Sequence, residues 1–449
     1  MKIALWILLI ASSVVNAATI AVIDSGVDVE HKDLLTNLWM NEGEIADNGR
    51  DEDRNGYQDD VYGWNFAEGN NLVIDRKYVG TFSDDPYKFF EIQGKSFLGQ
   101  ASAEEKEWVQ AKRKDKKFLA EMQKFGNFVH GTHVAGITVD NNREGQILSV
   151  KLIPTEVKPF IASLSQKNKN AEDKNLRWKI LTKALSALAD QQMTLLTEIA
   201  HYVGTHKADI ANGSFGTGFK QAKMITNIAY KAVFFKDPSK EDSDKAAKIF
   251  LNALIKSGKK MVDAAPNTLF VFAAGNDGSN NDEFPTSPTN IQADNVISVA
   301  ATYKYEFIAP FSNYGIKMVD VAAPGMLINS QIPGDEYLKV SGTSQAAPYV
   351  ANIAAQIKDI NPELAPKDIK AIIMGTVDAK KFLSDKVKAA GIVNMNRATH
   401  AAKLTFNMGV SEAISQAQQS ISDVRVDSTK SLKFPQAVTP LPLTNQFTL

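Results

Sequence analysis

Short apolar runs rich in β-branched residues alternate along this chain with stretches of helical spacing. The apolar runs lie at 19–23, 149–153, 208–211, 268–272, 296–299 and 318–321. Helix-length stretches such as 195–205 and 344–357 separate them. Continuous apolar strands that alternate with helices are typical of parallel sheets buried on both faces. We therefore expect an α/β fold, a three-layer sandwich with a mostly parallel central sheet flanked by helices.

Three polar, lysine-rich stretches interrupt this pattern near 82–127, 156–190 and 217–262, and we interpret them as insertions. The first predicts an amphipathic helix packed on the rest of the molecule, with a regulatory or substrate-gating role as the alternative. Its apolar positions at helical spacing are Trp108, Ala111, Phe118, Leu119, Met122 and Phe125. From about Leu404 the chain becomes rich in Ser, Gln and Thr, so we expect 404–449 to be a loosely ordered tail.

The composition limits the reactions and ligands that this chain can support. The 449 residues are 44% hydrophobic and carry 50 basic and 51 acidic side chains, which indicates a globular protein without the charge of a nucleic-acid binder. The chain has no Cys, which excludes disulfides, thiolate metal sites and a cysteine nucleophile. Any reaction must use Ser, His, Asp, Glu, Lys or a metal held by oxygen or nitrogen.

The N-terminus has the pattern of a secretory signal over 1–17. Lys2 precedes an apolar run that is too short to span a bilayer and that ends in small residues at Val15-Asn16-Ala17. The alternatives are a buried N-terminal strand or an uncleaved anchor. We expect a secreted or periplasmic protein with no membrane span after signal cleavage.

Four positions carry candidate chemistry. Asp24 closes an apolar run, at the end of a parallel strand where α/β sheets hold their sites, although such a residue is more often a turn or a cap. His130 and His133 lack the spacing of a zinc-protease helix, which disfavours a metal pair. Ser344 begins a helical stretch, where a hydroxyl is a cap unless a base reaches it. Asn276 follows another apolar run and is either part of a tight loop or an amide donor to an oxyanion.

The motifs around these residues, in the order Asp, His, Asn, Ser, resemble those of the subtilisin-like serine proteases over about 19–403. The resemblance implies that Ser344 is the nucleophile, His130 the general base and Asp24 the carboxylate that orients His130. Asn276 and the backbone amide of Ser344 would hold the oxyanion. His133 would be a structural neighbour. Gln345 stands where Met is usual and Tyr349 where His is usual, from which we expect local repacking.

The resemblance also implies a substrate-binding strand at Ser214, Phe215 and Gly216. Together with Ala273, Ala274 and Gly275, this strand should line the primary specificity pocket. The small side chains favour a large apolar substrate residue, whereas Glu283 would favour Lys or Arg.

An acidic segment at 51–60 predicts a structural Ca²⁺ site. Its first nine positions follow an EF-hand-like spacing with Gly56 at the turn, although Tyr62 stands where a bidentate Glu belongs. The candidate ligands are Asp51, Asp53, Asn55, the Tyr57 carbonyl, Asp59 and Asp60. The alternative is a solvated acidic loop.

Cleavage after Ala17 leaves no room for the folded propeptide usual in secreted members of the family. We therefore expect the insertions, the tail, or a separate inhibitor or chaperone to assist folding and restrain activity. The favoured function is a secreted serine endopeptidase, a monomer acting on protein or peptide substrates. The alternatives are a protease-like binding or chaperone protein without turnover, and a calcium-dependent adhesion module.

Overall fold

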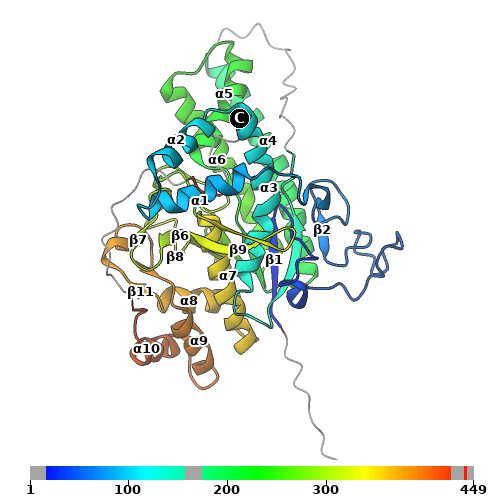
Figure 1. Ribbon diagram of the computed structural model, residues 1–449, viewed down its shortest axis with the longest axis vertical. Helices are drawn as coiled ribbons and strands as arrows, with labels where there is room; N and C mark the ends of the chain where they lie inside the picture. The colour runs from blue at the N-terminus through cyan, green and yellow to red at the C-terminus, as the bar shows by residue number, and fades with distance from the viewer. Residues whose placement is uncertain (1–16, 157–173, 426–438, 442–449) are drawn as a thin grey trace, which may run out of the picture.

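A sheet of ten strands forms the centre of the computed structural model, which describes residues 17–156, 174–425 and 439–441 (Figure 1). Along the sheet the strands follow the order β11-β12-β8-β6-β5-β4-β1-β3-β2, and β7 pairs with β6. Their bounds are β1 Thr19–Asp24, β2 Gly63–Asn65, β3 Gln146–Lys151, β4 Ile210–Gly213, β5 Leu269–Ala273, β6 Val296–Tyr303, β7 Phe307–Ile308, β8 Val321–Pro324, β11 Asp378–Ala379 and β12 Gly391–Ile392. All pairs are parallel except β6 with β7 and β11 with β12.

Side chains alternate between the two faces of this sheet and build a core on each. On β1, Ile20 and Val22 join one apolar cluster, whereas Ala21 and Ile23 join the other. The first face is covered by α3 Lys116–Thr138, α7 Thr343–Ile360, α8 Pro366–Gly375 and α9 Met395–Leu404. The second is covered by α4 Lys174–Thr205, α5 Phe219–Phe234 and α6 Lys240–Ala264. The predicted three-layer α/β sandwich is thereby confirmed, and each of the six apolar runs contributes to a strand, although only the last residue of 318–321 does so.

The first stretch interpreted as an insertion forms three helices instead of one. These are α1 Asp85–Phe97, α2 Ala103–Lys112 and the first half of α3. The chain turns between α2 and α3 because the Asp115 carboxylate caps α3, accepting from the N–H groups of Lys117 and Phe118. Trp108 and Ala111 therefore lie on a different helix from Phe118 and Met122.

The buried apolar side chains of α1, α2 and α3 pack against a hairpin of β9 Ile328–Ile332 and β10 Glu336–Val340. We call this group the outer cluster. Its buried members are Ile74, Phe89, Phe90, Ile92, Ala101, Val109, Phe118, Met122, Phe125, Phe128, Val129, Ile332, Leu338, Val340 and Leu441.

The interpretation of 217–262 as an insertion is wrong. This stretch forms α5 and most of α6, two of the three helices that cover one face of the sheet. Phe250 and Leu254 are fully buried in the same cluster as Phe270 and Phe272 of β5. The many lysines of these helices lie among exposed positions and hide the apolar stripe that packs on the sheet. Of the second stretch, 157–173 lies outside the described residues and 174–190 begins α4.

The tail is ordered over its first part, contrary to expectation. Residues Val410–Ser420 form α10, which packs on α8 and α9 with Ala413 and Ala417 buried. The Arg397 guanidinium fixes the end of α10 by donating to the Ile421 carbonyl and to Asp423.

The remaining tail residues lie outside the described part of the chain, except 439–441. So does the predicted signal, apart from Ala17. Over the described ranges, no helix has the length and apolarity needed to cross a membrane.

Candidate active site

The candidate carboxylate and base form a buried pair. Asp24 ends β1, and its Oδ1 accepts from the backbone N–H of Ser25 at 2.7 Å and lies 2.6 Å from His130 Nδ1. Both side chains are almost inaccessible to solvent. Within the described residues His130 Nε2 has no bonding partner, so this nitrogen is left to accept a proton.

His130 reaches Asp24 because α3 lies very close to the turn after β1. A Cβ on Gly131 would lie 2.2 Å from the Gly26 carbonyl oxygen, so only glycine fits beside His130. Gly26 itself has a φ of +107°, which favours glycine. The Gly131 N–H donates to the Ser25 hydroxyl at 3.0 Å and fixes the approach.

His133, the second histidine of α3, is a structural residue, as the resemblance implies. Its Nε2 donates to the Leu338 carbonyl of β10 at 2.9 Å. Burial lowers the pKa of His133 to about 4, although the bond to Leu338 opposes this shift, so the ring is neutral near neutral pH.

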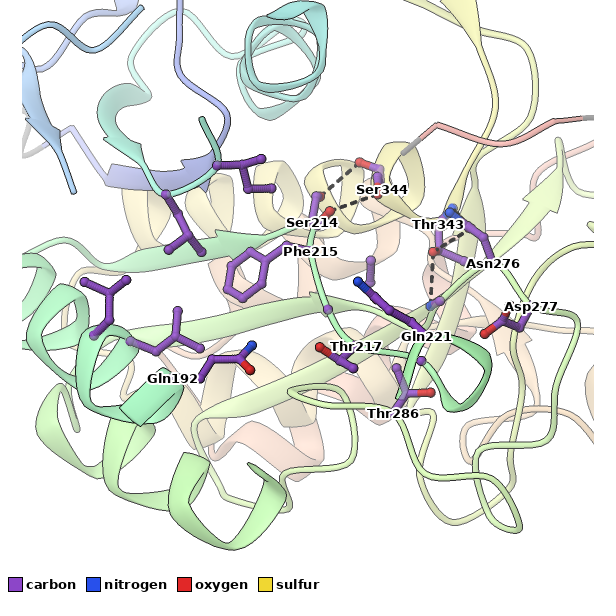
Figure 2. Close-up of a pocket in the computed structure, with 18 residues that line it drawn as sticks. Gln192, Ser214, Phe215, Thr217, Gln221, Asn276, Asp277, Thr286, Thr343 and Ser344 are labelled. Atoms are coloured by element: carbon purple, nitrogen blue, oxygen red, sulfur yellow. Dashed lines mark hydrogen bonds between the residues drawn. The ribbon is translucent and has the colours of Figure 1, made fainter. Parts of the chain in front are cut away.

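Ser344 is the second residue of α7 and exchanges two hydrogen bonds with Ser214, as the dashed lines in Figure 2 show. The Ser344 hydroxyl donates to the Ser214 carbonyl at 3.0 Å, and the Ser214 hydroxyl donates to the Ser344 carbonyl at 3.1 Å. The Ser344 carbonyl is available because Pro348, four residues later, has no N–H. Pro348 lies inside α7, beyond its first turn, and the Ser214 hydroxyl takes the place of the missing helical hydrogen bond.

Asn276 lies after β5 with its side-chain orientation fixed by Thr343. Its Oδ1 accepts from both the N–H and the hydroxyl of Thr343 at 2.9 Å (Figure 2). The remaining donor of the side chain, Nδ2, is left for a ligand in the cavity that Asn276 lines with Ser344. The N–H of Ser344 is a second donor, since the first N–H groups of a helix have no intrahelical partner.

A cavity of about 420 Å³ opens beside Ser344 (Figure 2). Five of the six residues predicted to line it do so, namely Ser214, Phe215, Gly216, Ala273 and Gly275. Ala274 does not, because it is fully buried on the other side of the strand end with Ala300 and Val319. Glu283 is also absent from the lining.

Sequence reasoning missed part of this cavity wall. The long helix α4 contributes Gln192, Leu195 and Leu196, and α5 contributes Gln221. These residues lie in or next to stretches interpreted as insertions, so only their helical spacing could have marked them. The polar part of the wall is uncharged except for Asp277, which pairs with Lys220 at 3.4 Å.

The two departures from the family pattern near Ser344 lie in different surroundings. Gln345 is fully buried, and its side-chain amide has no partner among the described residues. Tyr349 packs half-buried against the core below the sheet's first face.

The acidic segment brings together a different set of oxygens from the predicted one. Carboxylate oxygens of Glu44, Asp51 and Asp53 lie within 4.8 Å of one another. Gly56 has a φ of +97°, as the sharp turn requires. Carboxylate oxygens are the hard ligands that Ca²⁺ takes. Glu44 precedes the predicted loop, so the loop spacing does not include it.

The other predicted ligands lie outside this trio, and they accept hydrogen bonds from protein groups, as Glu44, Asp51 and Asp53 also do. The Asn55 Oδ1 accepts from the Tyr57 N–H at 2.7 Å, and the Asp59 carboxylate accepts from two backbone N–H groups of the preceding turn. Asp60 is buried. Burial pushes the pKa of Asp60 up, but hydrogen bonds from neighbouring side chains outweigh it and leave that pKa below its usual value. These neighbours are His206, Tyr202, Asn41 and Asn55. Asp60 is thus satisfied by protein groups.

Comparison with known proteins identifies the family. The family model described as the subtilase family matches residues 16–405. Subtilisin-like protease 1 of Plasmodium falciparum (isolate 3D7) is 27% identical over 396 residues, which cover 86% of this chain and 44% of that protein. The cell wall-associated protease of Bacillus subtilis (strain 168) is 38% identical over 118 residues, 26% of this chain and 12% of that protein.

Among solved structures, a cold adapted subtilisin-like serine proteinase is 18% identical with a TM-score of 0.44, covering 82% of this chain and 87% of that one. The chain spans about half the length of the curated relatives that it matches over most of its own length. Because the family match extends over most of the chain, the protein belongs to the subtilase family of serine proteases.

Proposed function

We propose that the protein is an active serine endopeptidase that cleaves peptide bonds through Ser344. The observation that carries this proposal is the buried hydrogen bond between Asp24 and His130, with His130 Nε2 unpaired among the described residues and Ser344 at the start of the neighbouring helix α7. A nucleophile, a base and a carboxylate that orients the base are the parts that acyl transfer needs.

The reaction begins with rotation of the Ser344 hydroxyl from the Ser214 carbonyl toward His130 Nε2, since catalytic hydrogen bonds often tighten only with substrate bound. His130 takes the hydroxyl proton while Oγ bonds to the scissile carbonyl carbon. The oxyanion receives hydrogen bonds from the Ser344 N–H and Asn276 Nδ2. His130 then gives its proton to the leaving amine as the peptide C–N bond breaks. Water, deprotonated by His130, hydrolyses the acyl-enzyme and returns Ser344 to its starting state.

The substrate residue before the scissile bond enters the 420 Å³ cavity. Apolar side chains of Phe215, Leu195 and Leu196 line part of this cavity, and Glu283 does not reach it. We therefore favour a large apolar residue at this position over Lys or Arg.

Labelling with a fluorophosphonate probe tests the proposal directly. Wild-type protein should be labelled at Ser344, and Ser344→Ala should not. Ser257→Ala is a matched control, because Ser257 of α6 bonds to Asp190 and does not line the cavity, so its loss should not affect labelling. A folded wild type that remains unlabelled would favour the binding or chaperone alternative instead.

We also propose that Glu44, Asp51 and Asp53 hold a structural Ca²⁺, which would neutralise their mutual repulsion. Chelator should then lower the thermal midpoint of unfolding of the wild type but not of Asp51→Asn. The exposed Asp47→Asn should respond like the wild type. An unchanged wild-type midpoint would count against the site.

The apolar run and small-residue exit before Ala18 support export of the protein. Mass spectrometry of protein recovered from the periplasm or medium of an expressing bacterium should find Ala18 at its N-terminus. A recovered chain that retains residues 1–17 would support the uncleaved anchor.

A further inference from the structure

The chain's last described residues, Thr439–Pro440–Leu441, lie against the segment that leads into Ser344. The Leu441 N–H donates to the Ser341 carbonyl at 2.6 Å. The Leu441 carbonyl oxygen lies so close to Gly342 that a Cβ there would be 2.2 Å from it. Gly342 is the N-cap of α7, two residues before the nucleophile. The peptide therefore passes along the nucleophile's own backbone and bonds to it as a strand would.

Both ends of this short segment are also fixed by the helices that precede His130. The Thr439 N–H donates to Gln93 Oε1 on α1 at 3.0 Å, and its hydroxyl accepts from Arg113 Nη2 at 3.0 Å. The Leu441 side chain is fully buried in the outer cluster. A backbone held by hydrogen bonds and an apolar side chain in a matching pocket are the two features of a bound extended peptide.

This peptide lies outside the open cavity, next to the residues that lead into Ser344. The cavity is lined by residues 214–218 and by Thr343 and Ser344, but by neither Ser341 nor Gly342 nor any member of the outer cluster. A substrate whose acyl part enters the cavity must continue past Ser344 on the other side. That continuation carries the residues after the scissile bond, and it meets Ser341, Gly342 and the pocket that Leu441 fills.

We propose that the pocket formed by α1, α3 and β10 beside Ser341 is the leaving-group subsite of this protease, and that Leu441 of the chain's own tail occupies it in place of substrate. The inference rests on the proposed peptidase function. The subsite takes an apolar residue of an extended peptide, since Leu441 is the ligand it holds. A tethered segment competes at an effective concentration on the order of millimolar, so the tail selects against substrates that need this subsite.

Two substrates with the same acyl part distinguish occupation of the leaving-group subsite by Leu441 from effects on the catalytic groups. The first ends in a chromogenic anilide and has no residue after the scissile bond. The second is a quenched fluorescent peptide with three residues after it, including an apolar one. In Leu441→Asp the buried carboxylate should expel the tail and raise kcat/KM for the extended peptide about 5- to 10-fold, with the anilide rate within about twofold of wild type.

Two further variants control for folding and for charge. Leu441→Met keeps an apolar side chain of similar volume and should retain the wild-type ratio of the two rates. Phe406→Asp places the same charge at an apolar side chain that is 64% exposed and should leave the ratio unchanged. The anilide rate itself reports whether the catalytic groups of each variant are intact.

The proposal is overturned if Leu441→Asp leaves the ratio at the wild-type value, even where its thermal midpoint falls, because the tail would then be a structural strap only. It is also overturned if both rates rise equally. If no variant cleaves either substrate, the peptidase proposal fails, and amide exchange decides the tail's placement. The Thr439 amide, which donates to Gln93, should then exchange more slowly in wild type than in Leu441→Asp, and equal exchange would show that the tail does not bind.

Discussion

The two sides of Ser344 are built by different means. The open cavity, which we propose as the site for the acyl part of a substrate, is lined by the ends of β4 and β5 and by helices packed on the same sheet face. The opposite side is built from α1, α3, the β9–β10 hairpin and the chain's own end. The register of the sheet fixes the first side, whereas side-chain packing between separate helices fixes the second. The first is therefore preformed, and the second depends on what fills it.

The largest expected effect concerns Asn276, whose side chain would bind the oxyanion formed with either substrate. Asn276→Ala removes the oxyanion donor and should lower kcat by about 10²–10³, the loss established for such donors in related enzymes. The anilide and the extended peptide should lose the same factor, because the oxyanion forms with either. Asn267→Ala, an exposed asparagine at the opposite end of β5, is the matched control and should be near wild type. A loss confined to the extended peptide would place Asn276 in leaving-group binding instead.

The second prediction concerns the wall of the leaving-group side, where His133 holds β10 through the Leu338 carbonyl. Because folding lowers the pKa of His133 to about 4 from 6.5, the unfolded chain binds the extra proton first. The stability contributed by neutral His133 is thus complete above pH 6.5 and is lost as the pH falls to about 4, a loss of about 3 kcal/mol.

His133→Gln keeps a donor for the Leu338 carbonyl but cannot titrate. Between pH 7 and pH 4 its free energy of unfolding in urea should fall about 3 kcal/mol less than that of wild type. Burial raises the pKa of Asp359 to about 6 and gives an opposite pH slope, but this slope is common to both proteins. Parallel stability curves would show that His133 titrates normally in the folded state.

The third prediction concerns the hydrogen bond from the Ser214 hydroxyl to the Ser344 carbonyl. Ser214→Ala leaves the Ser344 carbonyl without its donor and should lower kcat/KM about tenfold for both substrates. Pro348→Ala supplies the helical N–H that this carbonyl lacks. The double variant Ser214→Ala/Pro348→Ala should therefore recover part of the loss in a double-mutant cycle, and purely additive effects would refute the link.

The smallest expected effect concerns the charge of the open cavity. Gln221 lines it and Glu283 does not. Gln221→Glu should shift the preference between Phe and Lys before the scissile bond about fivefold toward Lys, a discounted value for a partly solvated charge pair. Glu283→Gln should leave this preference unchanged. A shift in the second variant would mean that Glu283 acts on the substrate after all.

The contrast between a side of Ser344 fixed by strand ends and a side fixed by helix packing also explains which parts of the site could be predicted from the sequence. Apolar runs locate the strands, and strand ends in a parallel sheet meet at one edge, so Asp24 and Asn276 could be placed at that edge. Their roles, and that of Ser214, followed from the resemblance of the surrounding motifs to those of the family. The outer cluster could not be derived, because helical spacing in Phe118 and Met122 does not show where the Asp115 cap breaks the helix. Glu44 was missed because it joins Asp51 only through a turn. The contact of Leu441 with Ser341 joins residues one hundred positions apart, for which no local pattern exists.

The continuity of α3 has a mechanical consequence. Phe118, in the outer cluster, and His130, in the buried pair with Asp24, lie on one uninterrupted helix. Their separation of twelve residues corresponds to about 18 Å of helix axis. Catalytic groups must be held within about 0.5 Å, so a tilt of α3 by about 2° about Phe118 would already misplace the imidazole. The packing of Phe118 against Phe89 of α1 and Trp108 of α2 thus sets the orientation of His130.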